Sequence, residues 1–162
     1  MMENKNRYIH YGHDSFNRNL FRPIRNREMF VKPWGGLWAS PIDAKLGWYE
    51  WCNRENFNVR RLSDSFMFTL SETAKVIHIR SVADLKELHD QEHPGWCKGV
   101  LPFKSIDFEK LLADGVDAVE LHLSEEDLTG CGFMEGLYWE LYGWDCDSIL
   151  IMNPDVVVVE EK

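Results

Sequence analysis

The spacing of hydrophobic and polar positions changes several times along the chain and divides it into short strands and short helices. Alternating apolar and polar residues indicate strands, whereas apolar residues three or four apart indicate helices. The pattern predicts strands at 7–12, 35–40, 65–70, 75–79, 118–123, 147–153 and 156–160. It predicts helices at 42–52, 81–89 and 106–114. This mixture indicates an α+β fold.

Local signals mark the ends of the three helices. Pro41 is expected to begin the first helix, because the first helical turn does not need its missing N–H group. Ser81 and Asp84 form a capping box at the start of the second helix, which the Pro-Gly pair at 94–95 follows. Gly115 supplies a left-handed stop for the third.

The strands are expected to form a mainly antiparallel sheet. Strands 65–70 and 75–79 are separated by a short polar turn, which predicts a hairpin. The apolar strands 147–153 and 156–160 follow one another across a Pro-Asp turn and are expected to pair near the centre of the sheet. No linker divides the chain, so a single domain over 1–162 is expected.

The connection between the first two strands, 14–33, is too long for a passive turn. Long ordered loops are often functional. This one contains scattered apolar anchors and several basic side chains, among them Arg18, Arg22 and Arg25.

Composition narrows the choice of partners. The net charge is -9, with 27 acidic against 18 basic residues, which disfavours sequence-independent attraction to nucleic acid or to an anionic membrane. The four cysteines form no C-x-x-C pair, so we expect reduced, buried thiols rather than a disulfide framework. No apolar run approaches the length of a membrane span, so we expect no membrane segment and a cytoplasmic location.

One short motif points to a zinc hydrolase. His89, Glu92 and His93 match the H-x-x-E-H pattern, in which two histidines share one face of a helix. The Pro-Gly pair directly after them breaks that helix, and a polar helix end explains the motif better. His10 and His13 lack a third ligand. The sequence therefore predicts no metal site, and the zinc hydrolase remains the weakest of three hypotheses.

Three remote segments carry the more specific pattern. The first is Ile-His-Tyr-Gly-His at 9–13. The second is Gly-Gly-Leu-Trp-Ala-Ser-Pro at 35–41, followed by the aromatic pair Trp48 and Tyr49. The third is Asp-Cys-Asp-Ser-Ile at 145–149, where an acidic residue opens an apolar strand. Each segment alone has an ordinary structural explanation, and their order along the chain is what points to a function.

At these residues the sequence resembles the ADP-ribosyltransferase superfamily, in the branch that groups diphtheria-toxin-like enzymes with the poly(ADP-ribose) polymerases. That branch has a His-Gly step on its first strand, a Gly-x-Tyr-Phe-Ala strand, a nicotinamide-stacking aromatic in the next helix and an acidic residue opening a late strand. The resemblance implies an ADP-ribosyltransferase-like fold, with split and mainly antiparallel β-sheets flanked by short helices. It also implies NAD as substrate.

The resemblance assigns roles to residues of all three segments. Asp147 corresponds to the catalytic acid, and Trp38 to the tyrosine of the second strand. His10 or Tyr11 takes the ribose-binding position, because Tyr11 separates His10 from Gly12, whereas the family's glycine follows its histidine directly. The acid here is Asp rather than the usual Glu, and is one methylene shorter.

The remaining implied residues bind the rest of NAD. Ser40 lies in the polar step after Trp38, and Trp48 or Tyr49 falls at the nicotinamide-stacking position. Gly12 would let the backbone approach the carboxamide, because a side chain there would crowd the ligand. The arginines of the long connection, Arg22 among them, are candidates for the pyrophosphate and equally candidates for ordinary surface charge.

The chemistry needs few groups. Nicotinamide leaves NAD as a neutral molecule, so the barrier lies in forming an oxocarbenium-like ribosyl centre, as in glycoside cleavage. A carboxylate that accepts a hydrogen bond from the ribose 2′-hydroxyl would stabilise that charge by about 3 kcal/mol. Aromatic faces would hold the pyridinium ring.

Two hypotheses therefore lead. The first is an NAD-dependent ADP-ribosyltransferase that moves ADP-ribose to a macromolecular acceptor, protein or nucleic acid, and releases nicotinamide. As a compact toxin-like modifier it would be accompanied by an inhibitory partner. The second is a non-catalytic module that binds NAD or ADP-ribose, which the shorter Asp147 side chain favours.

Overall fold

A seven-stranded mixed sheet organises the part of the chain that the structure describes. The structure is a computed structural model that describes residues 6–28, 30–92, 105–124, 127 and 136–161. The strands are β1 (Arg7–Tyr11), β2 (Leu37–Pro41), β3 (Ser65–Leu70), β4 (Val76–Ile79), β5 (Ala118–Leu121), β6 (Ser148–Ile151) and β7 (Val157–Val159). The α-helices are α1 (Trp48–Glu55), α2 (Val82–Lys86), α3 (Phe108–Ala113) and α5 (Leu137–Glu140), and the 3₁₀ turns are η1 (Arg18–Leu20), η2 (Val59–Ser63) and η4 (Pro154–Val156).

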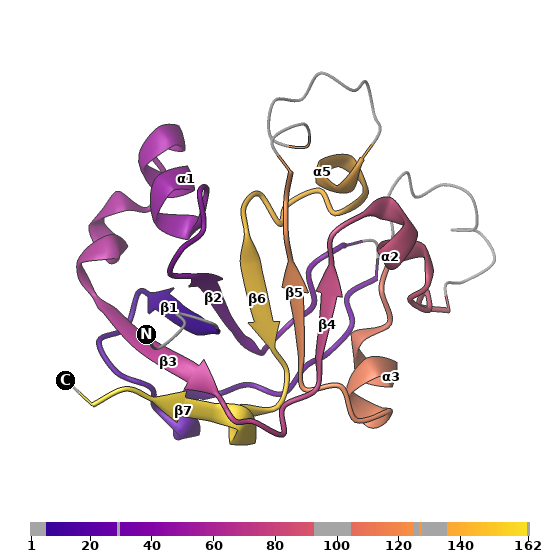
Figure 1. The fold of residues 1–162 in the computed structure, drawn as a ribbon, viewed down its shortest axis with the longest axis horizontal. Coiled ribbons are helices and arrows are strands. Elements are labelled where there is room, and N and C mark those ends of the chain that lie inside the picture. The colour runs from indigo at the N-terminus through magenta and orange to yellow at the C-terminus, as the bar shows by residue number, and fades with distance from the viewer. Residues whose placement is uncertain (1–5, 29, 93–104, 125–126, 128–135, 162) are drawn as a thin grey trace.

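The strands lie in the order β4-β5-β6-β2-β1-β3-β7. The β4–β5 pair is parallel, and the other pairs are antiparallel. In Figure 1, β4, β5 and β6 run side by side, and β3 and β7 cross the view at a steep angle to them. The predicted α+β class and mainly antiparallel sheet are confirmed.

Two hydrophobic layers cover opposite faces of the sheet. The first joins Leu150 of β6 and Val119 of β5 to Leu85 of α2 and Phe108 of α3, and Figure 1 shows these two helices beside β4. The second contains Ile149 and Ile151, which flank Leu150 in β6. It also contains residues of β1, β2 and β3: Tyr8, Leu37, Phe66 and Phe68. Strand β6 is buried on both faces, which explains why Ile149, Leu150 and Ile151 follow one another without a polar residue.

The predicted start of α2 agrees with the structure, and α3 begins at Phe108, two residues after the predicted 106. The Ser81 hydroxyl accepts the Asp84 N–H at 3.1 Å, and the Asp107 carboxylate accepts the Lys110 N–H at 3.0 Å. Gly115 follows α3 with φ +90°, as its left-handed stop requires. Helix α2 ends at Lys86, earlier than the predicted 89.

The predicted start of the first helix is wrong. Pro41 is the last residue of β2, where it is the partner of Tyr8, and α1 begins only at Trp48. The start is fixed by two side chains, since the Glu50 carboxylate accepts the Gly47 N–H at 2.9 Å and the Ser40 hydroxyl accepts the Trp48 N–H at 2.8 Å. These bonds satisfy N–H groups that a helix leaves free at its first turn.

Both predicted hairpins are wrong. Strand β3 pairs with β1 and β7, while β4 pairs with β5 in the other half of the sheet. The N–H of Ser71, directly after β3, is taken by the Val156 carbonyl at 2.9 Å, which ties this end of β3 to the last turn of the chain. Strands β6 and β7 do not pair either: η4 lies between them, β6 remains internal and β7 forms an edge.

No helix within the described residues has both the length and the apolar character needed to cross a membrane.

Gly35 is where the long connection passes close to the start of β2. Its φ is +78°, and a Cβ atom there would lie against the Pro23 carbonyl oxygen and 2.6 Å from that of Arg22. Gly143 also has a positive φ, +95°, but a Cβ there would have no heavy atom within 4 Å. A side chain at Gly143 would therefore cause backbone strain alone, whereas a side chain at Gly35 would cause both backbone strain and steric overlap.

We expect Gly35→Ala to destabilise the protein by roughly 2–5 kcal/mol, because a left-handed alanine costs about 1–2 kcal/mol and overpacking about 1–3 kcal/mol. Gly143→Ala should lower the free energy of unfolding only by the cost of a left-handed alanine, about 1–2 kcal/mol. Urea unfolding of both variants measures the difference. Equal losses would show that the contact at Gly35 relaxes freely.

Candidate functional site

An aromatic cavity lies where β1, β2, α1 and the start of β6 meet. Its volume is about 260 Å³. Five residues predicted to bind NAD line it together: His10, Tyr11, Trp38, Ser40 and Trp48. The structure therefore brings all three remote segments to one place, although the third contributes Cys146 and Ser148 rather than the predicted Asp147.

Indole rings form the walls of the aromatic cavity. The Trp38 ring meets the Trp144 ring edge-on at 4.8 Å between centroids, and Trp48 stacks on Trp51 at 5.2 Å. The Lys32 ammonium lies 5.1 Å from the centroid of Trp38 and 5.9 Å from that of Trp48. Burial lowers the pKa of Lys32, and the nearby Asp145 carboxylate opposes that shift. The cavity thus already holds a cation against two aromatic faces.

His10 is fixed by hydrogen bonds at both ring nitrogens. Its Nδ1 lies 2.6 Å from the Trp38 carbonyl oxygen, and since a carbonyl only accepts, Nδ1 carries a proton. Its Nε2 lies 2.9 Å from Nδ1 of His13, so in the neutral ring it accepts from His13. Burial lowers the pKa of His10, which favours this neutral form.

Four other predicted residues do not line the aromatic cavity. Tyr49 is 47% exposed and its ring faces that of Tyr11 at 5.8 Å. Arg22 is exposed, and its carbonyl accepts the Gly36 N–H. Gly12, with φ +104°, has open space where a Cβ would project. Asp147 is the fourth.

Asp147 faces a different cavity. It directly precedes β6, between Cys146 and Ser148, and these two neighbours line the aromatic cavity. The Asp147 carboxylate instead accepts the Leu123 N–H at 2.7 Å and lines a polar cavity of about 530 Å³. Burial raises the pKa of Asp147, and the bond from Leu123 opposes that shift.

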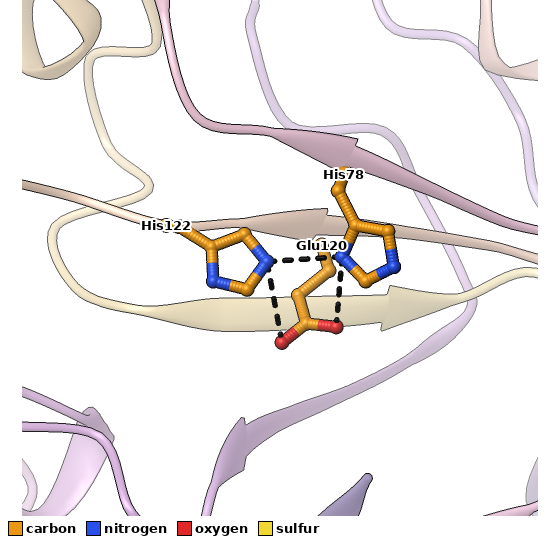
Figure 2. Close-up of side chains that lie close together, drawn as sticks. All are labelled: His78, Glu120 and His122. Carbon is orange, nitrogen blue, oxygen red and sulfur yellow. Dashed lines mark hydrogen bonds and ion pairs between the residues drawn. The ribbon is translucent and has the colours of Figure 1, made fainter. Parts of the chain in front are cut away.

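The polar cavity contains a compact group of potential metal ligands. Nδ1 of His78 lies 3.0 Å from Nε2 of His122, and the Glu120 carboxylate oxygens lie 3.5 Å from His78 and 3.6 Å from His122. Figure 2 shows the carboxylate turned toward both rings. Burial lowers the pKa of both histidines, that of His122 to about 4, and Arg80 adds to each shift. Among the described residues, these are the three His, Cys, Asp or Glu side chains whose ligand atoms lie close enough together to bind one metal ion.

The residues of the predicted zinc hydrolase are arranged differently. His89 and Glu92 lie beyond the end of α2 and are not helical, and Asp90 between them bridges to Ile106. His93 lies outside the described residues. The described part of the motif therefore lacks the helix that would align its ligands.

Some lining residues were missed from the sequence for identifiable reasons. Cys146 and Ser148 are two apart, so strand alternation places them on one face, and this signal was available. Glu120 and His122 have the same spacing. Lys32 and Trp144 carry no local signal, because their positions depend on how distant segments pack. No protein-family model, curated protein or solved structure matches the chain.

Cys146 has a thiol beside the aromatic cavity, but its environment makes it unreactive. It is 1% exposed, and burial raises its pKa to about 12. The thiolate is the reactive form.

We expect Cys146 in the folded protein to react with iodoacetamide at pH 8 at least about 100-fold more slowly than in urea, because a thiol with an unperturbed pKa of about 8.5 is partly ionised there. Peptide mass spectrometry after timed labelling measures this for Cys146 alone. Similar rates in both states would place the thiol in an open, ionisable environment.

Proposed function

We propose that the protein binds NAD with the nicotinamide ring in the aromatic cavity and transfers ADP-ribose to a macromolecular acceptor, protein or nucleic acid. The observation that carries the proposal is the convergence of His10, Tyr11, Trp38, Ser40 and Trp48 on one cavity. They come from β1 and, much later in the sequence, from β2 and the helix α1 that follows it, and they are residues to which the resemblance assigns nicotinamide and ribose contacts.

The cavity suits a flat cation. Lys32 already lies over the rings of Trp38 and Trp48. A pyridinium ring that displaced the Lys32 ammonium from these rings would gain the same attraction, about 0.5–2 kcal/mol, and would add stacking. Release of neutral nicotinamide would remove the charge that the cavity favours.

A second, smaller cavity offers room for the rest of the dinucleotide. Its volume is about 170 Å³, and His10 and Trp38 also form part of its wall. Phe16 and Phe21 of the long connection line it as well. NAD is larger than either cavity, so it would span both and cross His10 and Trp38 between them.

The catalytic carboxylate in this proposal is Asp147, which would turn from the Leu123 N–H toward the ribose. The orientation of Asp147 in the structure favours a second candidate function, an NAD-binding module that does not cleave its ligand, because no carboxylate is among the described residues that line the aromatic cavity. Asp145 is the matched comparison, since it flanks Cys146 on the other side and interacts with Lys32.

Nicotinamide release from NAD tests the transfer chemistry. We expect Asp147→Asn to lower kcat by about 100-fold or more with little change in KM, because the lost interaction acts on charge that develops in the transition state. Asp145→Asn should stay within a few-fold of the unchanged protein. The opposite order would assign the carboxylate to Asp145. Labelled NAD in a cell lysate then reports whether protein or nucleic acid receives the label.

NAD binding tests the cavity without requiring turnover. We expect Trp48→Leu to weaken NAD binding about tenfold in calorimetric titration, corresponding to loss of roughly 1.4 kcal/mol of ring contact. Trp139→Leu is the control, because Trp139 packs near Tyr142 and lines neither cavity. Binding without nicotinamide release would select the non-catalytic module. If the unchanged protein does not bind NAD, both functions are wrong.

A further inference from the structure

We propose that His78, Glu120 and His122 bind a divalent transition-metal ion, Zn²⁺ above others, at the polar cavity (Figure 2). None of the three residues lines the aromatic cavity. Asp147, the carboxylate of the proposed NAD chemistry, also lines the polar cavity but is not one of the three proposed ligands.

The separations between the ligand atoms fit one ion. Zinc lies about 2.0–2.1 Å from imidazole nitrogen and about 2.0–2.2 Å from carboxylate oxygen, usually in a tetrahedron, so neighbouring ligand atoms are about 3.3 Å apart. The two histidine nitrogens are 3.0 Å apart, and the nearest Glu120 oxygens lie 3.5 Å from His78 (Oε2) and 3.6 Å from His122 (Oε1). These nearest separations bracket the tetrahedral value, and one ligand atom from each residue lies within 4.8 Å of the other two.

The same distances argue against ordinary hydrogen bonding as the purpose of the group. The two carboxylate-to-imidazole distances are longer than the 2.7–3.2 Å of a good N–H···O bond. One histidine can donate to the other, but the carboxylate is then left facing both rings without bonding to either. A cation among the three groups would satisfy all of them.

The sheet holds the three side chains in position. His78 is the partner of Glu120 in the parallel β4–β5 ladder, and His122 is two residues beyond Glu120, on the same face. The His122 N–H donates to the Ile79 carbonyl at 2.9 Å, which extends the ladder to the third ligand. Ligands fixed by strand pairing need little reorganisation when they bind an ion.

Glu120 is unusual in its burial. It is 4% exposed, and no other charged side chain among the described residues is buried. A carboxylate is costly to bury unless it is paired or coordinates a metal. Its Oε2 accepts a hydrogen bond from the Tyr8 hydroxyl at 2.8 Å, and Tyr8 is itself buried. Such a bond to a ligating carboxylate orients it and is typical of the surroundings of metal ligands.

Three protein ligands leave a fourth position open toward the cavity. Sites of this composition keep an exchangeable water, unlike closed structural sites with four protein ligands. With Glu120 included, the charged side chains that line the cavity are balanced in sign: Arg7, Lys45 and Arg80 against Asp43, Glu120 and Asp147. The His10 and His13 pair is just as close but has no carboxylate as a third ligand in the described structure, so it serves as an internal comparison.

Titration of chelator-treated protein with ZnCl₂ tests the proposal. We expect one Zn²⁺ per chain, with affinity at least 100-fold lower in His122→Ala and in Glu120→Gln. Tyr8→Phe should lower affinity by about 10–100-fold through the orientation of Glu120. His13→Ala and His89→Ala are the matched controls and should bind like the unchanged protein. Thermal unfolding without metal checks that each variant is folded.

Cobalt provides a readout that does not depend on affinity. We expect Co²⁺ to give the visible absorption of a tetrahedral ion without a thiolate charge-transfer band, because the ligands are two imidazoles and a carboxylate. A thiolate band would assign the metal to cysteine and overturn the proposal. So would the absence of Zn²⁺ binding, or binding that His122→Ala and Glu120→Gln leave unchanged. None of these outcomes bears on NAD, so the two proposals fail separately.

Discussion

The pairing of β2 with β6 is the interaction on which the rest of the structure depends. It joins β4, β5 and β6 to the four strands on the other side, through Leu37, Trp38 and Ala39 opposite Ile151, Leu150 and Ile149. Both cavities lie along this junction. The aromatic cavity takes Trp38 and Ser40 from β2 and Ser148 from β6, and the polar cavity takes Pro41 and Asp147. Neither cavity would exist in either half of the sheet alone.

Alternation of side chains at the entry to β6 separates the two cavities chemically. Cys146 and Ser148 face the aromatic side, and Asp147 between them faces the polar side. One side presents indole rings, whose faces attract a flat organic cation. The other presents imidazoles and carboxylates, which suit a metal ion. A short stretch of chain thus contributes to two sites with different ligand chemistry.

The sequence predicts what depends on near neighbours and fails where remote segments choose between partners. Alternating and continuous apolar patterns located all seven strands, the Ser81 capping box located the start of α2, and Gly115 located the end of α3. Pairing was not predictable from turns, because the Ser71 N–H bonds to Val156 rather than within a hairpin. Five residues of the aromatic cavity were predicted by resemblance. The group of His78, Glu120 and His122 was not predicted, because only the parallel pairing of β4 with β5 brings His78 next to Glu120.

The crowding at Gly35 limits how this fold can vary. Two carbonyl oxygens occupy the space that any side chain would need, and the backbone there is left-handed. Any other amino acid at this position is therefore costly unless the loop before β2 is rebuilt. We expect a distant homologue that keeps this loop to retain glycine at the equivalent position, even after its cavity residues have diverged. Such a glycine would help to align sequences that are otherwise dissimilar.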